Sequence, residues 1–231
     1  MKATIDILRA ADDAAIARAA EELRAGGLAI LPTDTVYGVA ASAASRDAVR
    51  RLRALGDADA GDKLSRSSTW HAPSAQAAID AIGISAPMHL RLLDLFSPGP
   101  VRFLVEKPEP EIDAIVRGLG AQRGAFDSDG ALSVRVPDNA VTRAVLDAVR
   151  VPIIAERIVS VVGQGRELPA GVEESARAAG ITVAIDDGPT RYGKPSTAVR
   201  LLAGGGYRII SEGAIEERYI RKKMERVILF V

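Results

Sequence analysis

Two hydroxyls, a carboxylate and a phenol stand close together in the segment Thr33-Asp34-Thr35-Val36-Tyr37. The apolar run Leu28–Leu31 precedes them and indicates a buried strand, with Pro32 between the two. In open α/β sheets, ligands bind beyond the ends of strands. The spacing therefore predicts a polar site for a small molecule at this turn. The alternative is a strand-to-helix turn, rich in turn-forming residues, that binds nothing.

Helices and strands alternate around this turn, which predicts an α/β protein with a mixed sheet. Apolar residues at helical spacing indicate helices at 12–25, 45–55, 74–82, 88–96, 139–149 and 172–179. Short apolar runs indicate strands at 28–31, 101–105, 132–136, 152–155 and 181–185, and a hairpin formed by 197–202 and 207–211. Polar, small-residue stretches at 56–68 and 118–130 are expected to be loops.

The composition excludes several kinds of site. The chain has no cysteine, so disulfides, thiolate metal sites and a cysteine nucleophile are unavailable within these residues. Its two histidines, His71 and His89, are too few for a histidine metal centre, and no protein-held metal is expected. Lysine plus arginine equals aspartate plus glutamate at 30 each, so net charge does not point to nucleic acid. Without an apolar run of about 18 residues or a signal-peptide core, we expect a cytoplasmic protein without membrane contact.

Several short segments, spread over residues 15–215, resemble the YrdC/YciO-like family, whose members include L-threonylcarbamoyladenylate synthases. They are LPTDTVYG (31–38), SPGPV (97–101), LSVRVPD (132–138), VPIIA (151–155), GP followed by PSTAV (188–199), and SEGAI (211–215). The resemblance implies that residues 1–215 form an open, twisted mixed sheet. Helices would cover its faces, and a concave cavity would hold the ligand.

The same resemblance implies a reaction in which ATP, L-threonine and bicarbonate form threonylcarbamoyl-AMP, for threonylcarbamoyl-adenosine modification of tRNA. Mg²⁺ would accompany ATP, because the charge of the phosphates must be offset. By resemblance, the amino-acid substrate would contact Thr33, Thr35, Tyr37, His71 and Arg135. The nucleotide would contact Lys63, Arg66, Ser196 and Thr197. No catalytic residue is assigned.

Each assignment has a structural alternative. The planar guanidinium of Arg135 suits bidentate contact with a carboxylate, but it could equally form an ion pair within the protein. His71 could be packed or solvated, and Lys63 and Arg66 could be solvated loop charges. Ser196 and Thr197 could satisfy backbone groups where a strand begins.

The expected phosphate-binding segments depart from the family's pattern. Relatives carry Lys-x-Arg just after the second helix. Aligning this chain with them forward from that helix, or backward from the histidine that follows the loop, places neither a lysine nor an arginine at those two positions. Where relatives have threonine after the Pro-Gly-Pro turn, this chain has Arg102. Their Ser-x-Asn segment is replaced by residues 156–159 (ERIV), and Glu156 brings a carboxylate that opposes phosphate unless a cation offsets it. We therefore expect a remodelled pocket, in which Lys63, Arg66, Arg102 and Arg157 supply the positive charge of an active enzyme.

Two other hypotheses remain. One is a non-catalytic family member that binds a small ligand, tRNA or double-stranded RNA and regulates a fused phosphatase; RNA binding would need a basic strip near Arg50, Arg51 and Arg53. The other is a carbamoyl-transfer domain of the hydrogenase-maturation type, although the accompanying zinc-finger cysteines are absent from this sequence.

The last residues are expected to form a separate unit. Residues 216–225 are charged and indicate a helix, and residues 226–231 (RVILFV) indicate an apolar strand. Residues 224–231 resemble the opening strand of low-molecular-weight tyrosine phosphatases, so 216–231 could begin a second domain. The sequence gives no indication of the oligomeric state.

Overall fold

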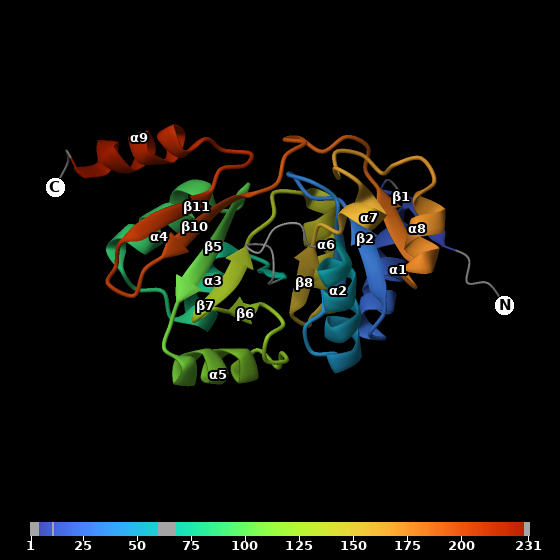
Figure 1. The fold of residues 1–231 in the computed structure, drawn as a ribbon, viewed down its shortest axis with the longest axis horizontal. Helices are drawn as coiled ribbons and strands as arrows, with labels where there is room; N and C mark the ends of the chain where they lie inside the picture. Colours follow the sequence, from blue (N-terminus) through green and yellow to red (C-terminus); the bar gives the residue numbers. More distant parts are fainter. Residues whose placement is uncertain (1–4, 11, 60–67, 229–231) are drawn as a thin grey trace.

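The computed structural model describes residues 5–10, 12–59 and 68–228, and these residues form a mixed sheet with helices on both faces (Figure 1). The strands are β1 Asp6–Arg9, β2 Leu28–Leu31, β3 Gly38–Ser42, β4 Thr69–His71, β5 Val101–Glu106, β6 Asp127–Ser128, β7 Ala131–Arg135, β8 Ile153–Glu156, β9 Val183–Asp186, β10 Thr197–Leu201 and β11 Tyr207–Ser211. The helices are α1 Asp13–Arg24, α2 Arg46–Asp59, α3 Ala75–Ile82, α4 Pro87–Phe96, α5 Glu109–Gly118, α6 Ala140–Val149, α7 Val159–Val162, α8 Val172–Ala178 and α9 Glu217–Ile228.

The strand order is β1-β9-β2-β3-β8-β4-β7-β5-β10-β11, and β6 pairs with β7 beside this path. The pairs β1/β9, β9/β2, β4/β7 and β5/β10 are parallel, whereas the other pairs are antiparallel. The predicted α/β class with a mixed sheet is confirmed, and so is the predicted hairpin, which β10 and β11 form.

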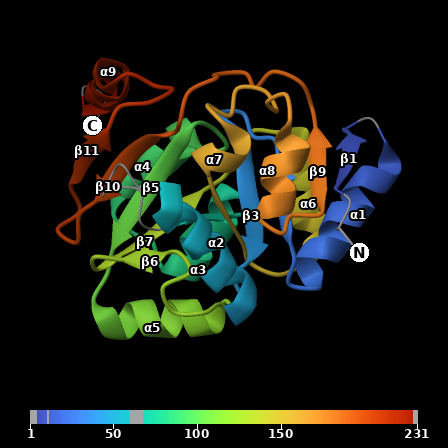
Figure 2. The same cartoon turned by 45° about the vertical axis from the view of Figure 1, so that its right-hand side comes forward.

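Two apolar layers hold the sheet between its helices. In β2, Leu28 and Ile30 join the larger core, while Ala29 and Leu31 face the smaller one. That smaller core is filled by α1 and α6, which pack on one face, while α2, α7 and α8 cover the opposite face (Figure 2). Both faces of the central strands are therefore buried, which explains why β2 is a continuous apolar run rather than an alternating one.

Side-chain caps fix where several predicted helices begin. The Ala48 N–H donates to the Ser45 hydroxyl at 3.3 Å, as the sequence predicts. Ser74 accepts the N–H of Ala77 at the start of α3, and Asn139 caps α6 in the same way. None of the described helices has the length and apolarity to cross a membrane.

Some predicted boundaries are wrong. Residues 56–59, expected in a loop, continue α2, and the remainder of that loop, 60–67, lies outside the described residues. The expected loop 118–130 contains the end of α5 and the short strand β6. Gly56 lies inside α2, where glycine usually costs stability. The carboxylate of Glu156 packs against it, and a Cβ at this position would stand 2.7 Å from Oε1 of Glu156.

The strand predicted for 226–231 is also wrong over the part that the structure describes. Residues 226–228 continue α9, and 229–231 lie outside the described residues. Ile220 and Met224, four residues apart, are buried on one face of this helix, which is the spacing of neighbours on a helix surface. Whether a second domain begins here stays a prediction.

Candidate active site

The Thr33–Tyr37 turn is held by its own hydroxyl groups. The Thr33 hydroxyl donates to the Val36 carbonyl at 2.7 Å and accepts the N–H groups of Thr35 and Val36 at 3.1 and 3.2 Å. This is a local turn closed by a threonine side chain. The Thr33 hydroxyl, predicted to bind substrate, thus already makes three bonds that shape the turn.

Hydrogen bonds from a second loop, around residues 190–192, fix the position of this turn. The Tyr192 N–H donates to the Asp34 carbonyl at 3.0 Å, and the Thr190 hydroxyl donates to the Thr35 carbonyl at 2.8 Å. From a third segment, the Gly165 carbonyl accepts the Tyr37 N–H at 2.7 Å. The turn is therefore fixed by segments distant in sequence, which makes it a rigid wall for a ligand.

Arg135, at the end of β7, is the centre of a buried polar network. Its Nη2 donates to the carboxylate of Asp34, and the two side chains are 4% and 0% exposed. Nη1 donates to the hydroxyls of Thr35 and Ser196 at 2.6 and 2.9 Å, and Nε donates to the Gly99 carbonyl at 3.0 Å. Burial lowers the pKa of Arg135, and the negative charge of Asp34 partly offsets that effect.

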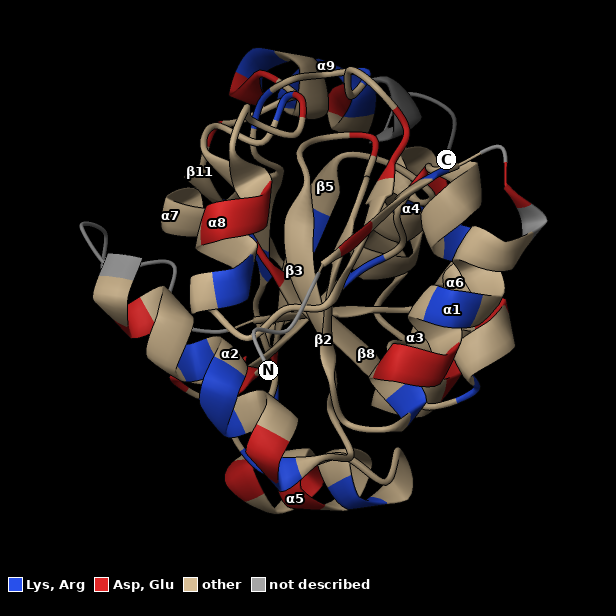
Figure 3. Ribbon diagram, turned by 90° about the vertical axis from the view of Figure 1, so that its right-hand side faces the viewer, with Lys and Arg blue, Asp and Glu red and all other residues tan. Residues whose placement is uncertain are grey.

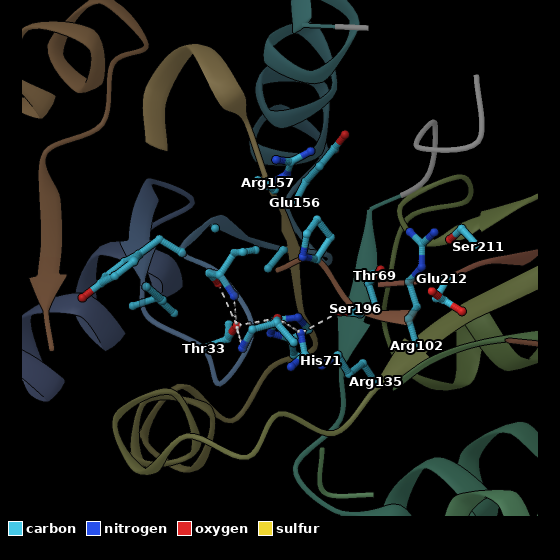
Figure 4. Close-up of a pocket in the computed structure, with 17 residues that line it drawn as sticks. Thr33, Thr69, His71, Arg102, Arg135, Glu156, Arg157, Ser196, Ser211 and Glu212 are labelled. Carbon is cyan, nitrogen blue, oxygen red and sulfur yellow. Dashed lines mark hydrogen bonds between the residues drawn. The ribbon is translucent and has the colours of Figure 1, made fainter. Parts of the chain in front are cut away.

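This network forms one wall of a cavity of about 320 Å³. The other walls come from the ends of β4 and β8, from β5, and from the segments around 195–196 and 211–212 (Figure 4). Its polar lining residues are Thr33, Thr35, Tyr37, Thr69, His71, Arg102, Arg135, Glu156, Arg157, Ser196, Ser211 and Glu212. A cavity of this size suits a small molecule.

His71 contributes a neutral imidazole to the cavity. Its side chain is buried beside Arg135, to which its strand pairs in parallel register. Burial, reinforced by the positive charge of Arg135, lowers the pKa of His71 to about 3. Near neutral pH the ring can therefore exchange hydrogen bonds with a ligand but supplies no charge.

The structure brings all the predicted substrate residues to the cavity, but only part of the predicted nucleotide set. Thr33, Thr35, His71, Arg135 and Ser196 line the cavity together. Of the two predicted nucleotide residues at the start of the final hairpin, Ser196 and Thr197, only Ser196 lines the cavity. Thr197 is not among the lining residues: its hydroxyl donates to the Ile215 carbonyl at 2.5 Å and accepts the N–H groups of Gly213 and Ile215. Lys63 and Arg66 lie outside the described residues.

Tyr37 lies at the margin of the cavity but directs its hydroxyl elsewhere. That hydroxyl accepts the Asp187 N–H and donates to the Gly188 carbonyl, both at 2.8 Å. Burial raises the pKa of Tyr37 above its usual range. The phenol hydroxyl therefore holds the loop at residues 187–188, and the ring of Tyr37 contributes only apolar surface to the cavity.

The sequence prediction missed the partner of Arg135. Asp34 stands in the predicted turn, yet only the fold brings it to a strand 101 positions away. It also missed Thr69, whose hydroxyl lies 3.0 Å from that of Ser133. Thr69 belongs to the three-residue strand β4, which is too short for a periodic signal.

A mixed sheet with a ligand-sized cavity at its strand ends defines an α/β protein with a candidate small-molecule site. The comparisons with known proteins narrow this class. The family model for Sua5, YciO and YrdC, described as "Telomere recombination", matches residues 21–213. The chain belongs to the Sua5/YciO/YrdC family.

Relatives agree with this assignment. The chain is 27% identical over 194 residues to the threonylcarbamoyl-AMP synthase of Bacillus subtilis, covering 81% of this chain and 50% of that protein. The fold is similar to P. abyssi Sua5 complexed with L-threonine, with a TM-score of 0.71 and 24% identity over 95% of this chain and 60% of the other. E. coli YciO gives a TM-score of 0.74 at 16% identity, covering 92% and 97% of the two chains. The chain thus spans about half of the Bacillus synthase.

Proposed function

We propose that this chain is a threonylcarbamoyl-AMP synthase that uses the cavity beside the Thr33–Tyr37 turn. The observation that carries the proposal is the rigid constellation of Arg135, Thr35 and Ser196 in a cavity that also holds a second arginine. Support comes from the names of the relatives, one a threonylcarbamoyl-AMP synthase and the other a Sua5 protein that binds L-threonine.

The proposed reaction needs positioning more than covalent catalysis. The amino nitrogen of threonine attacks the carbon of bicarbonate, a molecule of water leaves, and a carbamate forms. A carbamate oxygen then attacks the α-phosphorus of ATP, and pyrophosphate leaves with the electron pair of the broken P–O bond. Fixed donors that face the developing negative charge, and a cavity that keeps water from the labile product, are what such a site must supply.

Mg²⁺ would enter as part of the substrate, bound to the phosphates of ATP. The described part of the chain contains no cluster of three or more histidine or acidic side chains able to hold a metal ion. Mg²⁺ in nucleotide sites is bound mainly by substrate phosphates and water, with few protein ligands. The use of the product in tRNA modification stays a prediction from the family.

A specific observation favours the second candidate, a non-catalytic module that binds a small ligand. Glu156 lines the cavity, and its carboxylate lies against Gly56 of α2. A carboxylate beside the phosphates of ATP would repel them. Under this alternative the cavity takes a molecule with less negative charge than a triphosphate.

The structure lends little support to RNA binding through α2. Charges of both signs lie along α2 and α5 (Figure 3). Arg50 pairs with Asp47, the Arg51 guanidinium donates to the Gly180 carbonyl at 2.7 Å, and the Arg53 guanidinium donates to the carbonyl of Gly124. These cations of the predicted basic strip are engaged within the protein, so RNA binding stays a prediction.

Pyrophosphate release separates the two candidates. The purified chain is incubated with ATP, Mg²⁺, bicarbonate and L-threonine, and released pyrophosphate is measured with each component omitted in turn. The synthase predicts release that requires both threonine and bicarbonate. Ser196→Ala, which removes a hydroxyl from the cavity, should slow release, while Ser175→Ala, at a hydroxyl on α8 outside the cavity lining, should not. No release from a folded protein supports the binding module, and release that does not require threonine would contradict the synthase proposal.

A further inference from the structure

Three arginines line the cavity, and two of them, Arg135 and Arg102, differ in how many of their N–H groups already bind other protein groups. Arg135 donates from Nε and twice from Nη1, and its Nη2 donates to Asp34. A guanidinium has five N–H groups, so four of them are already used. A ligand that bound Arg135 through two parallel bonds would have to displace Asp34, whose side chain is fully buried. Arg135 therefore holds the wall of the cavity together.

Arg102, in contrast to Arg135, has N–H groups that the described residues leave open to a ligand. It lies on β5, where Val101, Phe103 and Val105 face the core and the alternate residues face the other side of the sheet. Its side chain lines the cavity (Figure 4), and within the described residues its guanidinium makes no hydrogen bond or ion pair. Glu212, which also lines the cavity, accepts the Glu217 N–H at 2.9 Å and so serves the start of α9.

Among the described residues, Arg102 is a charged donor without a hydrogen-bond or ion-pair partner. Burial lowers its pKa, and the charge of Arg135 adds to that effect, while Glu156 opposes it. A guanidinium nevertheless stays protonated in proteins. This charge is partly shielded from water, so an anion that reaches it is bound more strongly than it would be at the protein surface. His71 is neutral at pH 7, so it offers that anion no charge to bind.

We propose that Arg102 binds the oxyanion of the ligand in this cavity, either a carboxylate or a phosphate. The inference deepens the proposed function, and it rests on that function only in treating the cavity as the substrate site. Glu156 acts electrostatically on the same guanidinium, so a polyphosphate would meet its carboxylate. The carboxylate of an amino acid is therefore the oxyanion that the local charges favour, and the α-phosphate of a nucleotide is the alternative source.

The test compares Arg102→Gln and Arg102→Lys with a matched control, Arg143→Gln. Arg143 is an exposed arginine on α6 and is not among the residues that line the cavity. Each protein is titrated calorimetrically with L-threonine alone, with ATP and Mg²⁺, and with inorganic pyrophosphate. Loss of threonine affinity identifies the carboxylate, and loss confined to ATP and pyrophosphate identifies the phosphate.

We expect Arg102→Gln to weaken one of these ligands about 10- to 100-fold, because a charge-assisted bidentate contact is lost. The affinity of Arg102→Lys should fall between those of Arg102→Gln and the unaltered protein, and the affinity of Arg143→Gln should stay within about threefold of the unaltered protein. Binding of all three ligands by Arg102→Gln within threefold of the unaltered protein would overturn the proposal, as would an unaltered protein that binds none of them.

Thermal unfolding separates a binding role from a structural one. Without ligand, Arg102→Gln should unfold at the same temperature as the unaltered protein or a higher one, because the substitution removes a partly buried cation that has no hydrogen-bond or ion-pair partner in the described part of the chain. The stabilisation by ligand should be lost. A lower unfolding temperature without ligand, with the ligand effect retained, would mean that Arg102 is structural.

The two proposals can fail separately. If oxyanion binding depends on Arg102 but no threonine-dependent pyrophosphate appears, the synthase proposal fails and the role of Arg102 stands. If pyrophosphate is released and Arg102→Gln binds and turns over normally, only the role of Arg102 fails.

Discussion

Replacing Asp34 with alanine should destabilise the folded protein by about 3–5 kcal/mol, the usual cost of removing one partner from a buried ion pair. Oδ1 of Asp34 accepts from Arg135 Nη2 and from the Asp138 N–H at 3.1 Å, and both charged side chains are almost fully buried. The substitution leaves the guanidinium without its counter-charge and the Asp138 N–H without its acceptor. Because a domain has about 5–15 kcal/mol of stability in total, the loss is a large part of it.

The assay is urea unfolding, supported by thermal unfolding. For a chain of this size the loss corresponds to a fall of roughly 6–20 °C in the unfolding temperature. Asp34→Asn is the matched control, because its carbonyl oxygen can still accept both bonds while the charge is gone, so its cost should be smaller. The double replacement Asp34→Leu with Arg135→Met should recover much of the loss, since apolar pairs often replace buried ion pairs well. An Asp34→Ala protein within about 1 kcal/mol of the unaltered one would refute the reasoning.

Three further substitutions test other parts of the site. The pKa of His71 in the folded protein lies below its ordinary value, so the unfolded chain binds the proton first as pH falls. The contribution of His71 to the unfolding free energy is therefore complete above pH 6.5 and is lost as the pH falls toward 3. His71→Gln should therefore flatten the pH dependence of the unfolding free energy between about pH 4 and 6.5, and parallel profiles would contradict this. Tyr37→Phe removes the acceptor of the Asp187 N–H and should cost about 1–3 kcal/mol in thermal unfolding, whereas an unchanged unfolding temperature would show that the bond is dispensable. Gly213→Ala would place a Cβ 2.2 Å from the Pro195 carbonyl oxygen and should cost about 1–3 kcal/mol in urea, with weaker ligand binding; a fully stable variant would mean that this close approach is relieved at no cost.

The sequence predicted the parts of the fold that local patterns encode. Leu28–Leu31 is an uninterrupted apolar run, and it forms β2 with the predicted boundaries. Gly38–Ser42 escaped notice because its small residues are buried on both faces and show no alternation. At the other end of the chain, RVILFV has the composition of a strand, but the described part continues a helix that packs through Ile220 and Met224. Tertiary packing decided that element, and local composition could not reveal it.

For the site, the sequence predicted which residues would meet but not what each would do. Thr33, Arg135 and Ser196 reach one cavity, as the family resemblance implied. Their roles depend on contacts between distant segments: the Arg135 guanidinium pairs with Asp34 from another strand end rather than standing open. Arg102 was identifiable as a departure from the family's pattern, and the alternation along β5 explains why its side chain leaves the core for the cavity.

The most direct test of the central claim is calorimetry of the purified chain with ATP and Mg²⁺, with and without L-threonine. If the cavity is a threonylcarbamoyl-AMP synthase site, ATP binds, and threonine strengthens its binding because the two substrates occupy adjoining parts of one cavity. No heat with either ligand, from a protein shown to be folded by its cooperative unfolding, would contradict the account and leave a family scaffold without the family's chemistry.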